Sequence, residues 1–174
     1  MANGERVAGD AAERASLADW LGGQREHVLG ILEGLDDAQL HRAMLPSGWT
    51  FLGMVQHLAF DVERYWFRCI IGGESLTIVG TEPEDRPNYW EIADDVDARQ
   101  LLATYRDEIE RSNAIISATP LDQPPAQRDE WWGDWEVPDL RFVLLHVLAE
   151  TACHAGHLDA ARELVDGRKW LSLT

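Results

Sequence analysis

Two side chains in the last third of the sequence have the types and the spacing of a metal site. Glu150 and His154 are four residues apart, so in a helix they lie on the same face, one turn apart. A facing helix of a bundle can add a third ligand, and His57 is the residue of the second predicted helix with an obvious metal-binding group at a similar depth. Two imidazoles and a carboxylate suit a divalent metal ion and leave coordination positions open for water or substrate.

The spacing alone leaves other ligand sets open. His146 and His157 lie on the same helical stripe as Glu150 and His154, so either can replace one of the pair or support the ligands from behind. Polar pairs four residues apart are also common in helices that bind nothing, where hydrogen bonds satisfy them. The sequence therefore predicts a metal site without choosing its ligands.

Three further residues have the chemistry to act beside such a site. Asp61 follows His57 by one helical turn and can orient its ring or act as a base, or it is simply a solvated acid. Arg162 can meet a substrate carboxylate, or it pairs with one of the many acids. Trp135 belongs to a tryptophan cluster that can wall the mouth of a substrate pocket or anchor a loop.

Four segments with helical apolar periodicity position these residues. The pattern predicts helices over residues 16–34, 51–71, 94–118 and 139–165. Two long connections rich in proline, glycine and acidic residues, 74–90 and 119–138, separate the last three helices, and connections of this length often have a function. These elements predict an all-α fold, a four-helix bundle with two long crossover loops.

The N-terminal residues have a different composition. Residues 1–15 are rich in alanine, glycine and glutamate and lack large apolar side chains, which indicates a flexible lead-in. Ser16 and Asp19 resemble a capping box, so the first helix is expected to begin there. Residues 16–174 are then expected to form a single domain, of a size that can bury a sizeable core.

Composition excludes several classes of function. The chain has 174 residues and a formal net charge of −16, which disfavours binding to nucleic acid or to anionic membranes. No segment approaches the about 18 uninterrupted apolar residues of a membrane span, and the N-terminus lacks the apolar stretch of a signal peptide. Cys69 and Cys153 are too few for a disulfide framework. We therefore expect a cytoplasmic protein that binds neither nucleic acid nor membranes.

Two motifs carry a resemblance to a known superfamily. They are QHLA followed by ERYWF within residues 56–67, and HVLAETACHAGH over residues 146–157. Both resemble the DinB-like superfamily of four-helix bundles, which includes YfiT-like metal-dependent hydrolases and mycothiol-dependent maleylpyruvate isomerases. The similarity extends over residues 17–167 and is nearest to an uncharacterised actinobacterial branch labelled mini-circle protein.

The resemblance implies a particular ligand set. Many members bind a metal through a histidine early in the second helix and two histidines four residues apart on the fourth. By that pattern the ligands here are His57, Glu150 and His154, with glutamate in the middle position as in the mycothiol-dependent isomerase. Many members have glutamine where this chain has His157, so the resemblance implies that His157 supports the ligands or contacts substrate.

The resemblance also implies a type of reaction. One divalent metal ion is expected, with zinc first and nickel or ferrous iron as alternatives, and it lowers the pKa of bound water or of a thiol. Characterised relatives use low-molecular-weight thiols such as mycothiol, so we expect a thiol transferase, an isomerase or a hydrolase acting on a small electrophile. A homodimer is expected by analogy with other bundles. The alternative is a non-catalytic metal-binding protein that acts in a stress response or as an interaction module.

Overall fold

Four long helical segments make up most of the structure. The computed structural model describes the backbone of residues 2–79 and 88–170, with side chains from residue 9 onward. Three of the segments are the α-helices α1 (Ala2–Leu32), α4 (Ala98–Ala118) and α5 (Leu140–Asp166). The fourth begins as α3 (Phe51–His57) and continues directly into a π-helix, η1 (Leu58–Ile71). The change of helix type falls at His57, one of the predicted ligands, and π-helical turns are frequent at functional sites.

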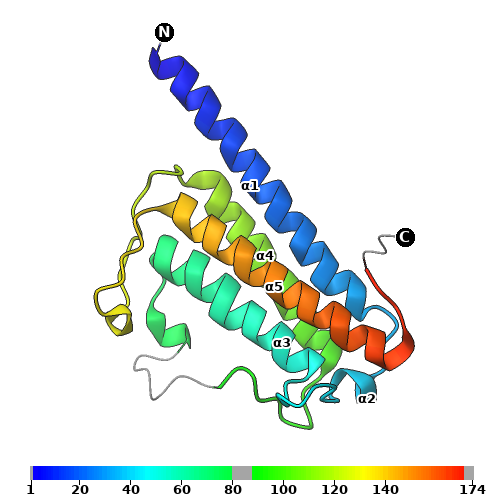
Figure 1. Cartoon of the computed structure of the whole chain (residues 1–174). Coiled ribbons are helices and arrows are strands. Elements are labelled where there is room, and N and C mark those ends of the chain that lie inside the picture. The colour runs from blue at the N-terminus through cyan, green and yellow to red at the C-terminus, as the bar shows by residue number, and fades with distance from the viewer. Residues whose placement is uncertain (1, 80–87, 171–174) are drawn as a thin grey trace.

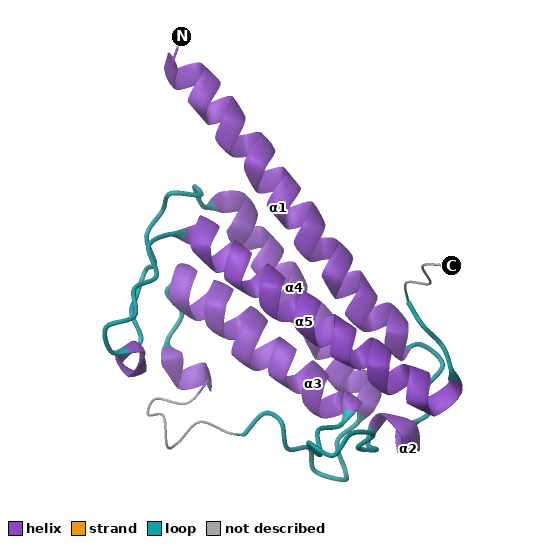
Figure 2. Cartoon of the chain, viewed as in Figure 1, coloured by secondary structure: helices purple, strands orange, loops and turns teal. Residues whose placement is uncertain are grey.

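The remaining regular elements are short helices. They are α2 (Asp37–Leu40), η2 (Leu76–Val79) and η4 (Glu130–Trp132). The described residues contain an isolated bridge but no strand, so the prediction of an all-α protein is confirmed (Figure 2). Part of the first predicted connection, residues 80–87, lies outside the described residues. In the part of the chain that is described, no helix is both long and apolar enough to cross a membrane.

The ends of the predicted helices depend on local capping. Thr50 accepts a hydrogen bond from the backbone N–H of Gly53 at 3.0 Å, and Asp139 accepts one from Phe142 at 2.9 Å. Gly167 ends α5 with a φ of +79°, a left-handed conformation that glycine adopts without a steric penalty. The predicted second and fourth helices therefore begin and end within a residue of their expected positions.

Two helix starts differ from the prediction. The first helix begins at Ala2, so Ser16 lies inside α1 and the predicted cap there was wrong. Residues 2–15 have no apolar stripe, but alanine and glutamate favour a helix without one. The residues predicted as a flexible lead-in are thus helical from Ala2, and this part of α1 extends beyond the other helices in Figure 1. The third helix begins at Ala98 instead of residue 94, because Asp97 caps it.

The long segments pack side by side around one apolar core (Figure 1). Helix α1 packs along α5, α4 packs along η1, and α5 also contacts η1. Contacts of Arg141 with Glu13, and of Arg162 with the carbonyl of Ile31, show that α1 and α5 run in parallel. This packing brings α5 against the α3–η1 segment, the two elements that contain the predicted ligands.

Buried ion pairs also hold these helices together. Arg25 of α1 donates two hydrogen bonds to Glu63 of η1, at 2.7 and 2.6 Å, and a third to Asn113 of α4 at 2.8 Å. Arg64 and Arg68 of η1 both donate to Glu108 of α4. Glu63, Glu108 and Arg25 are almost completely buried, so these charges are stable in the core only because they are paired.

Candidate metal centre

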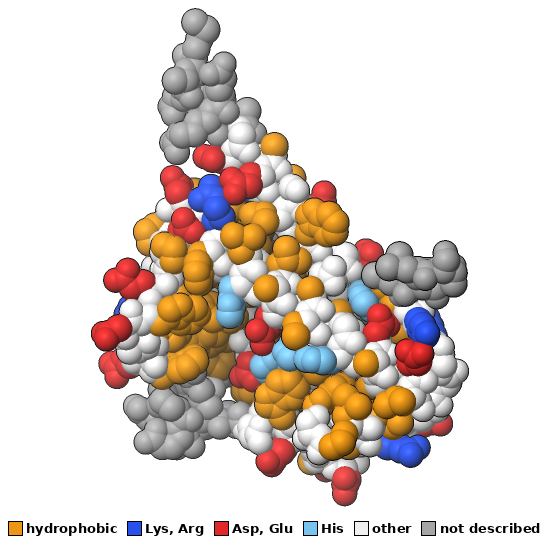
Figure 3. Space-filling view, viewed as in Figure 1, with side chains coloured by type: hydrophobic (Ala, Val, Ile, Leu, Met, Phe, Trp, Pro, Cys, Tyr) orange, Lys and Arg blue, Asp and Glu red, His pale blue; other side chains and the backbone are white. Residues whose placement is uncertain are grey.

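Three predicted ligands meet where α5 crosses the junction of α3 and η1. His57, Glu150 and His154 each offer one ligand atom, and these atoms all lie within 4.8 Å of one another. Oε1 of Glu150 is 3.5 Å from Nε2 of His57 and 3.2 Å from Nε2 of His154. Among the described residues this is the one group of three or more metal-binding side chains that converges in this way. Figure 3 shows histidine and acidic side chains gathered together in the middle of one face.

Asp61 and Trp90 hold the ring of His57. Nδ1 of His57 lies 2.8 Å from a carboxylate oxygen of Asp61, one turn further along the helix. The indole of Trp90 stacks on the same ring, with 4.2 Å between centroids and 20° between planes. With its Nδ1–H directed to Asp61, His57 presents Nε2 to Glu150. Of the roles considered for Asp61, this contact supports the orienting one.

The electrostatics of the cluster favour an anionic glutamate between two imidazoles. The hydrogen bond with His154 and then the nearby ring of His57 hold the pKa of Glu150 well below its usual range. Burial lowers the pKa of His57, but the hydrogen bond with Asp61 and the nearby carboxylate of Glu150 outweigh burial and raise that pKa above its ordinary value of 6.5. A carboxylate and two nitrogen donors are therefore ready to neutralise a cation.

The donor set fits a divalent metal ion. Nε2 of His57 is buried and makes no hydrogen bond, and the same holds for Nδ1 of His154. A buried polar atom without a partner costs free energy, which metal ligation by the His57 nitrogen would recover. Ligand atoms about 2.1 Å from a tetrahedral ion lie about 3.4 Å apart, close to the separations observed here. His57, Glu150 and His154 can therefore hold the ion, and the carboxylate of Asp61 behind His57 is the usual support for such a ligand.

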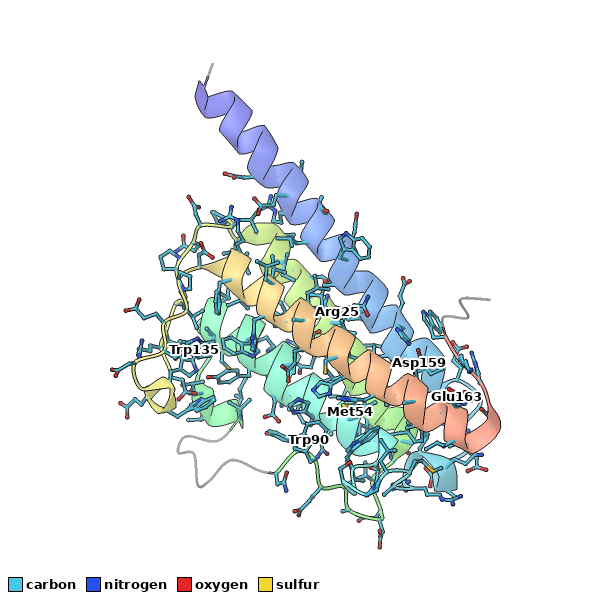
Figure 4. The ribbon with its side chains drawn as sticks, in the orientation of Figure 1. Arg25, Met54, Trp90, Trp135, Asp159 and Glu163 are labelled. Carbon is cyan, nitrogen blue, oxygen red and sulfur yellow. The ribbon has the colours of Figure 1, made fainter. Side chains whose placement is uncertain are left out.

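Trp90 is a site residue that the sequence analysis missed. Besides stacking on His57, its ring lies edge-on to His154, with centroids 5.5 Å apart. Trp90 lies within the connection predicted to have a function, but neither periodicity nor spacing distinguishes it from the other residues there. Figure 4 shows Trp90 beside α3.

The backbone around Trp90 is fixed by residues of α3. Nε2 of Gln56 donates to the carbonyl oxygens on both sides of Trp90, at 3.0 and 3.1 Å. Gly53 allows the loop to approach closely, because a Cβ at this position would lie 2.5 Å from the carbonyl oxygen of Trp90. The QHLA motif therefore supplies both a candidate ligand and the residue that holds the loop over it.

A pocket of about 340 Å³ opens next to the ligand cluster. Its lining is mostly aromatic and consists of Asp61, Tyr65, Trp66, Val79, Trp131, Trp135, His146 and Glu150. Trp135, for which the sequence left a pocket wall and a loop anchor open, lines this pocket. His146 packs against Trp66 and Trp135 in the pocket wall, at centroid distances of 4.7 and 5.9 Å, and burial lowers its pKa. The structure places His146 in this wall and not in the ligand cluster.

His157 lies at the rim of the site. It is exposed, and its ring centroid is 5.7 Å from that of His154 and 6.4 Å from that of Trp49. It does not join the three converging ligands, which agrees with the supporting or substrate-contacting role that the resemblance implies.

Arg162 does not reach the pocket. Its guanidinium is buried and donates to the carboxylate of Asp166 and to the backbone carbonyls of Ile31 and Glu33. These bonds tie the end of α5 to the end of α1. Of the two roles predicted for Arg162, the structure therefore supports the ion pair and not contact with a substrate carboxylate, because its donors are used elsewhere.

Comparison with known proteins identifies the family of this chain. A family model described as mycothiol-S-transferase matches residues 16–167, which contain every residue of the candidate site. Neither the curated proteins nor the solved structures include a significant match. The family lies within the DinB/YfiT-like superfamily, so the resemblance to that superfamily is confirmed. The chain belongs to the mycothiol-S-transferase family.

Proposed function

We propose that this protein is a metal-dependent S-transferase that joins a mycothiol-like low-molecular-weight thiol to a small electrophile. The observation that carries the proposal is the convergence of His57, Glu150 and His154 with a buried, unpaired ring nitrogen. Membership of the mycothiol-S-transferase family supports the choice of a thiol over water. Zinc is the ion we expect first, with nickel or ferrous iron as alternatives.

Each residue of the site has a part in this chemistry. A divalent ion bound here would lower the pKa of a thiol, so that the more nucleophilic thiolate is available at neutral pH. Asp61 fixes the ring of His57, and Trp90 shields one face of that ring from water. His157, exposed at the rim, is placed to take up the thiol proton and pass it to solvent. The thiol sulfur then bonds to the electrophilic carbon, and the leaving group departs with its bonding electrons.

We infer that the protein is cytoplasmic and forms a homodimer, as expected from the sequence. We also infer that the four long helical segments form the four-helix bundle of the DinB-like proteins. Both described cysteines are free, which fits the reduced cytoplasm where such thiols are kept. A homodimer is proposed because large apolar side chains are exposed on α1 and α5, with Trp20 66% and Leu145 51% exposed.

The test is a transfer assay on untagged protein. Mycothiol and 1-chloro-2,4-dinitrobenzene are mixed with the protein as purified, after chelation, and after zinc, nickel or ferrous iron has been restored. The proposal expects that chelation abolishes thioether formation and that one of these ions restores it. A transfer rate that chelation leaves unchanged would contradict metal dependence. Bound metal without transfer would instead favour a non-catalytic metal-binding protein.

A further inference from the structure

The pocket beside the ligand cluster has a composition that selects among substrates. It reaches Glu150, a proposed ligand, and Asp61, which orients another, so a molecule in the pocket is adjacent to the site of thiol activation. The rest of its lining is aromatic or aliphatic apart from His146. Resting on the proposed function, we propose that this pocket binds the electrophilic substrate and selects flat aromatic molecules that lack a negative charge.

The aromatic wall is built before any ligand binds. The hydroxyl of Tyr65 accepts hydrogen bonds from the indole N–H groups of Trp131 at 3.2 Å and Trp132 at 2.7 Å, and donates one to buried Asp129 at 3.0 Å. These bonds join the connection before α5 to η1. Preformed pockets of this kind bind ligands without the entropic cost of ordering their walls.

The wall exposes aromatic surface that folding alone would bury. Trp135 is 40% exposed and Trp131 is 54% exposed, although both are held in place by their neighbours. Trp135 contacts Trp66, Trp132 and His146 edge-on, so its remaining surface is directed away from the core. Figure 4 shows Trp135 beside η1, next to the connection that precedes α5. Rigid, exposed indoles are suited to stacking on a flat ring.

The charges at the pocket oppose an anionic ligand. Asp61 and Glu150 contribute two carboxylates, whereas no lysine or arginine is among the described lining residues. Arg162, the arginine expected to meet a substrate carboxylate, is bonded between α5 and the end of α1. In the proposed reaction, Glu150 and the thiolate would balance the charge of a bound divalent ion, so a carboxylate or sulfonate in the pocket would still face Asp61 without a compensating side-chain cation.

A binding experiment with unreactive ligands tests the inference separately from transfer. The probes are 4-nitrotoluene and 4-nitrobenzenesulfonate, which share a ring and differ in charge, and Kd is measured by equilibrium dialysis. Both are measured with the protein as purified and again after chelation, because neither probe needs a metal ion or a thiol. We expect 4-nitrotoluene to bind at least about tenfold more tightly after chelation, when no ion offsets the carboxylates of Asp61 and Glu150.

Single tryptophan variants test whether 4-nitrotoluene binds in this pocket. Trp135→Leu is expected to weaken 4-nitrotoluene binding by at least about fivefold, because it removes an aromatic face of the pocket. Trp20→Leu, an exposed tryptophan of α1 that does not line the pocket, is the matched control and should leave Kd unchanged. Circular dichroism checks that the variants fold, and Trp131→Leu replaces Trp135→Leu if the latter does not.

The outcomes separate this inference from the proposed function. Equal or tighter binding of the sulfonate after chelation overturns the inference, as does binding of 4-nitrotoluene that Trp20→Leu weakens more than Trp135→Leu. If 4-nitrotoluene binds as expected but neither metal nor transfer is found, the pocket is supported and the S-transferase proposal fails. If transfer is metal-dependent but the sulfonate is preferred, the S-transferase proposal is supported and the pocket inference fails.

Discussion

The helix formed by α3 and η1 contains two polar clusters that differ in how completely they are paired. In the first, the guanidinium of Arg25 donates twice to Glu63 and once to Asn113, and both charged side chains are about as buried as the apolar core. In the second, His57 and His154 each keep one buried ring nitrogen without a hydrogen bond. The second cluster is the less buried of the two, with 35% of the Glu150 side chain exposed against 1% of the Glu63 side chain, so deeper burial does not explain its unmatched nitrogens.

The comparison indicates what each cluster is for. A cluster whose donors and acceptors match has its charges satisfied within the protein, and its contribution is to hold α1, η1 and α4 in register. A cluster with unmatched nitrogens next to an anionic carboxylate is incomplete until something binds. Substitutions in the first cluster should therefore lower stability, and substitutions in the second should remove metal and activity.

The largest expected effect is on activity, in the unpaired cluster. His57→Ala and His154→Ala should each lower the S-transfer rate by about three orders of magnitude, because a bound metal ion supplies several kcal/mol of catalysis. Glu150→Gln should be less severe, since an amide oxygen can still ligate. His41→Ala, outside the cluster, is the control and should keep the full rate in the same assay. Full activity in both histidine variants would remove the proposed ligand set.

The next effect is on stability, in the paired cluster. Glu63→Ala should lower the free energy of unfolding by about 3–5 kcal/mol, because it leaves the charge of Arg25 buried and unpaired. Glu163→Ala, which removes the exposed pair with Lys169, should cost less than about 1 kcal/mol. Urea denaturation of both variants measures the difference. Similar costs for the two would show that burial adds nothing to the paired cluster.

A smaller effect should follow from the residue behind His57. Asp61→Asn should weaken zinc binding by about 10–100-fold, because the ring of His57 loses the carboxylate that orients it. Asp37→Asn is a matched control, since Asp37 faces His41 with the same four-residue spacing on a helix outside the cluster. Competition with a chromogenic chelator gives both affinities. An unchanged zinc affinity in Asp61→Asn would show that Asp61 is a solvated acid that does not support the ligand.

The smallest effect is a shift in pH dependence. The pKa of His57 is raised above 6.5 despite burial, so protons should compete with zinc and weaken its binding as the pH falls through this raised value. In the metal-free protein, the protonated ring of His57 stabilises the fold at pH values below the pKa that this ring has in the unfolded chain. This stabilisation is lost as the pH rises through the raised pKa of the folded protein. Asp61→Asn should move the midpoint for zinc binding to lower pH. A midpoint that does not move would mean that Asp61 has no influence on this proton.

The sequence predicted the helices with clear chemical boundaries. Thr50, Asp139 and Gly167 are local signals, and the helices they border were placed within a residue. The first helix was expected to begin at Ser16 and not at Ala2, because residues 2–15 have helix propensity without an apolar stripe. The π-helix after His57 has no pattern of its own, since its wider turns depend on packing against α4 and α5.

The candidate site was predictable to the extent that it depends on spacing within one helix. The pair of Glu150 and His154 follows from a four-residue interval, and His57 follows from its place in the facing helix. The choice of this set over one with His146 or His157 needed the family resemblance. Trp90 and the destination of Arg162 could not be predicted, because both depend on contacts between segments distant in the sequence. The unpaired nitrogens likewise appear only once every neighbour is in place.

The central claim is that the unpaired cluster holds a metal ion. Elemental analysis of the untagged protein after mild dialysis, beside His57→Ala and His154→Ala, tests it most directly. The account predicts about one zinc, nickel or iron ion per chain in the unaltered protein and almost none in either variant. Unaltered protein that is metal-free and takes up none of these ions would contradict it.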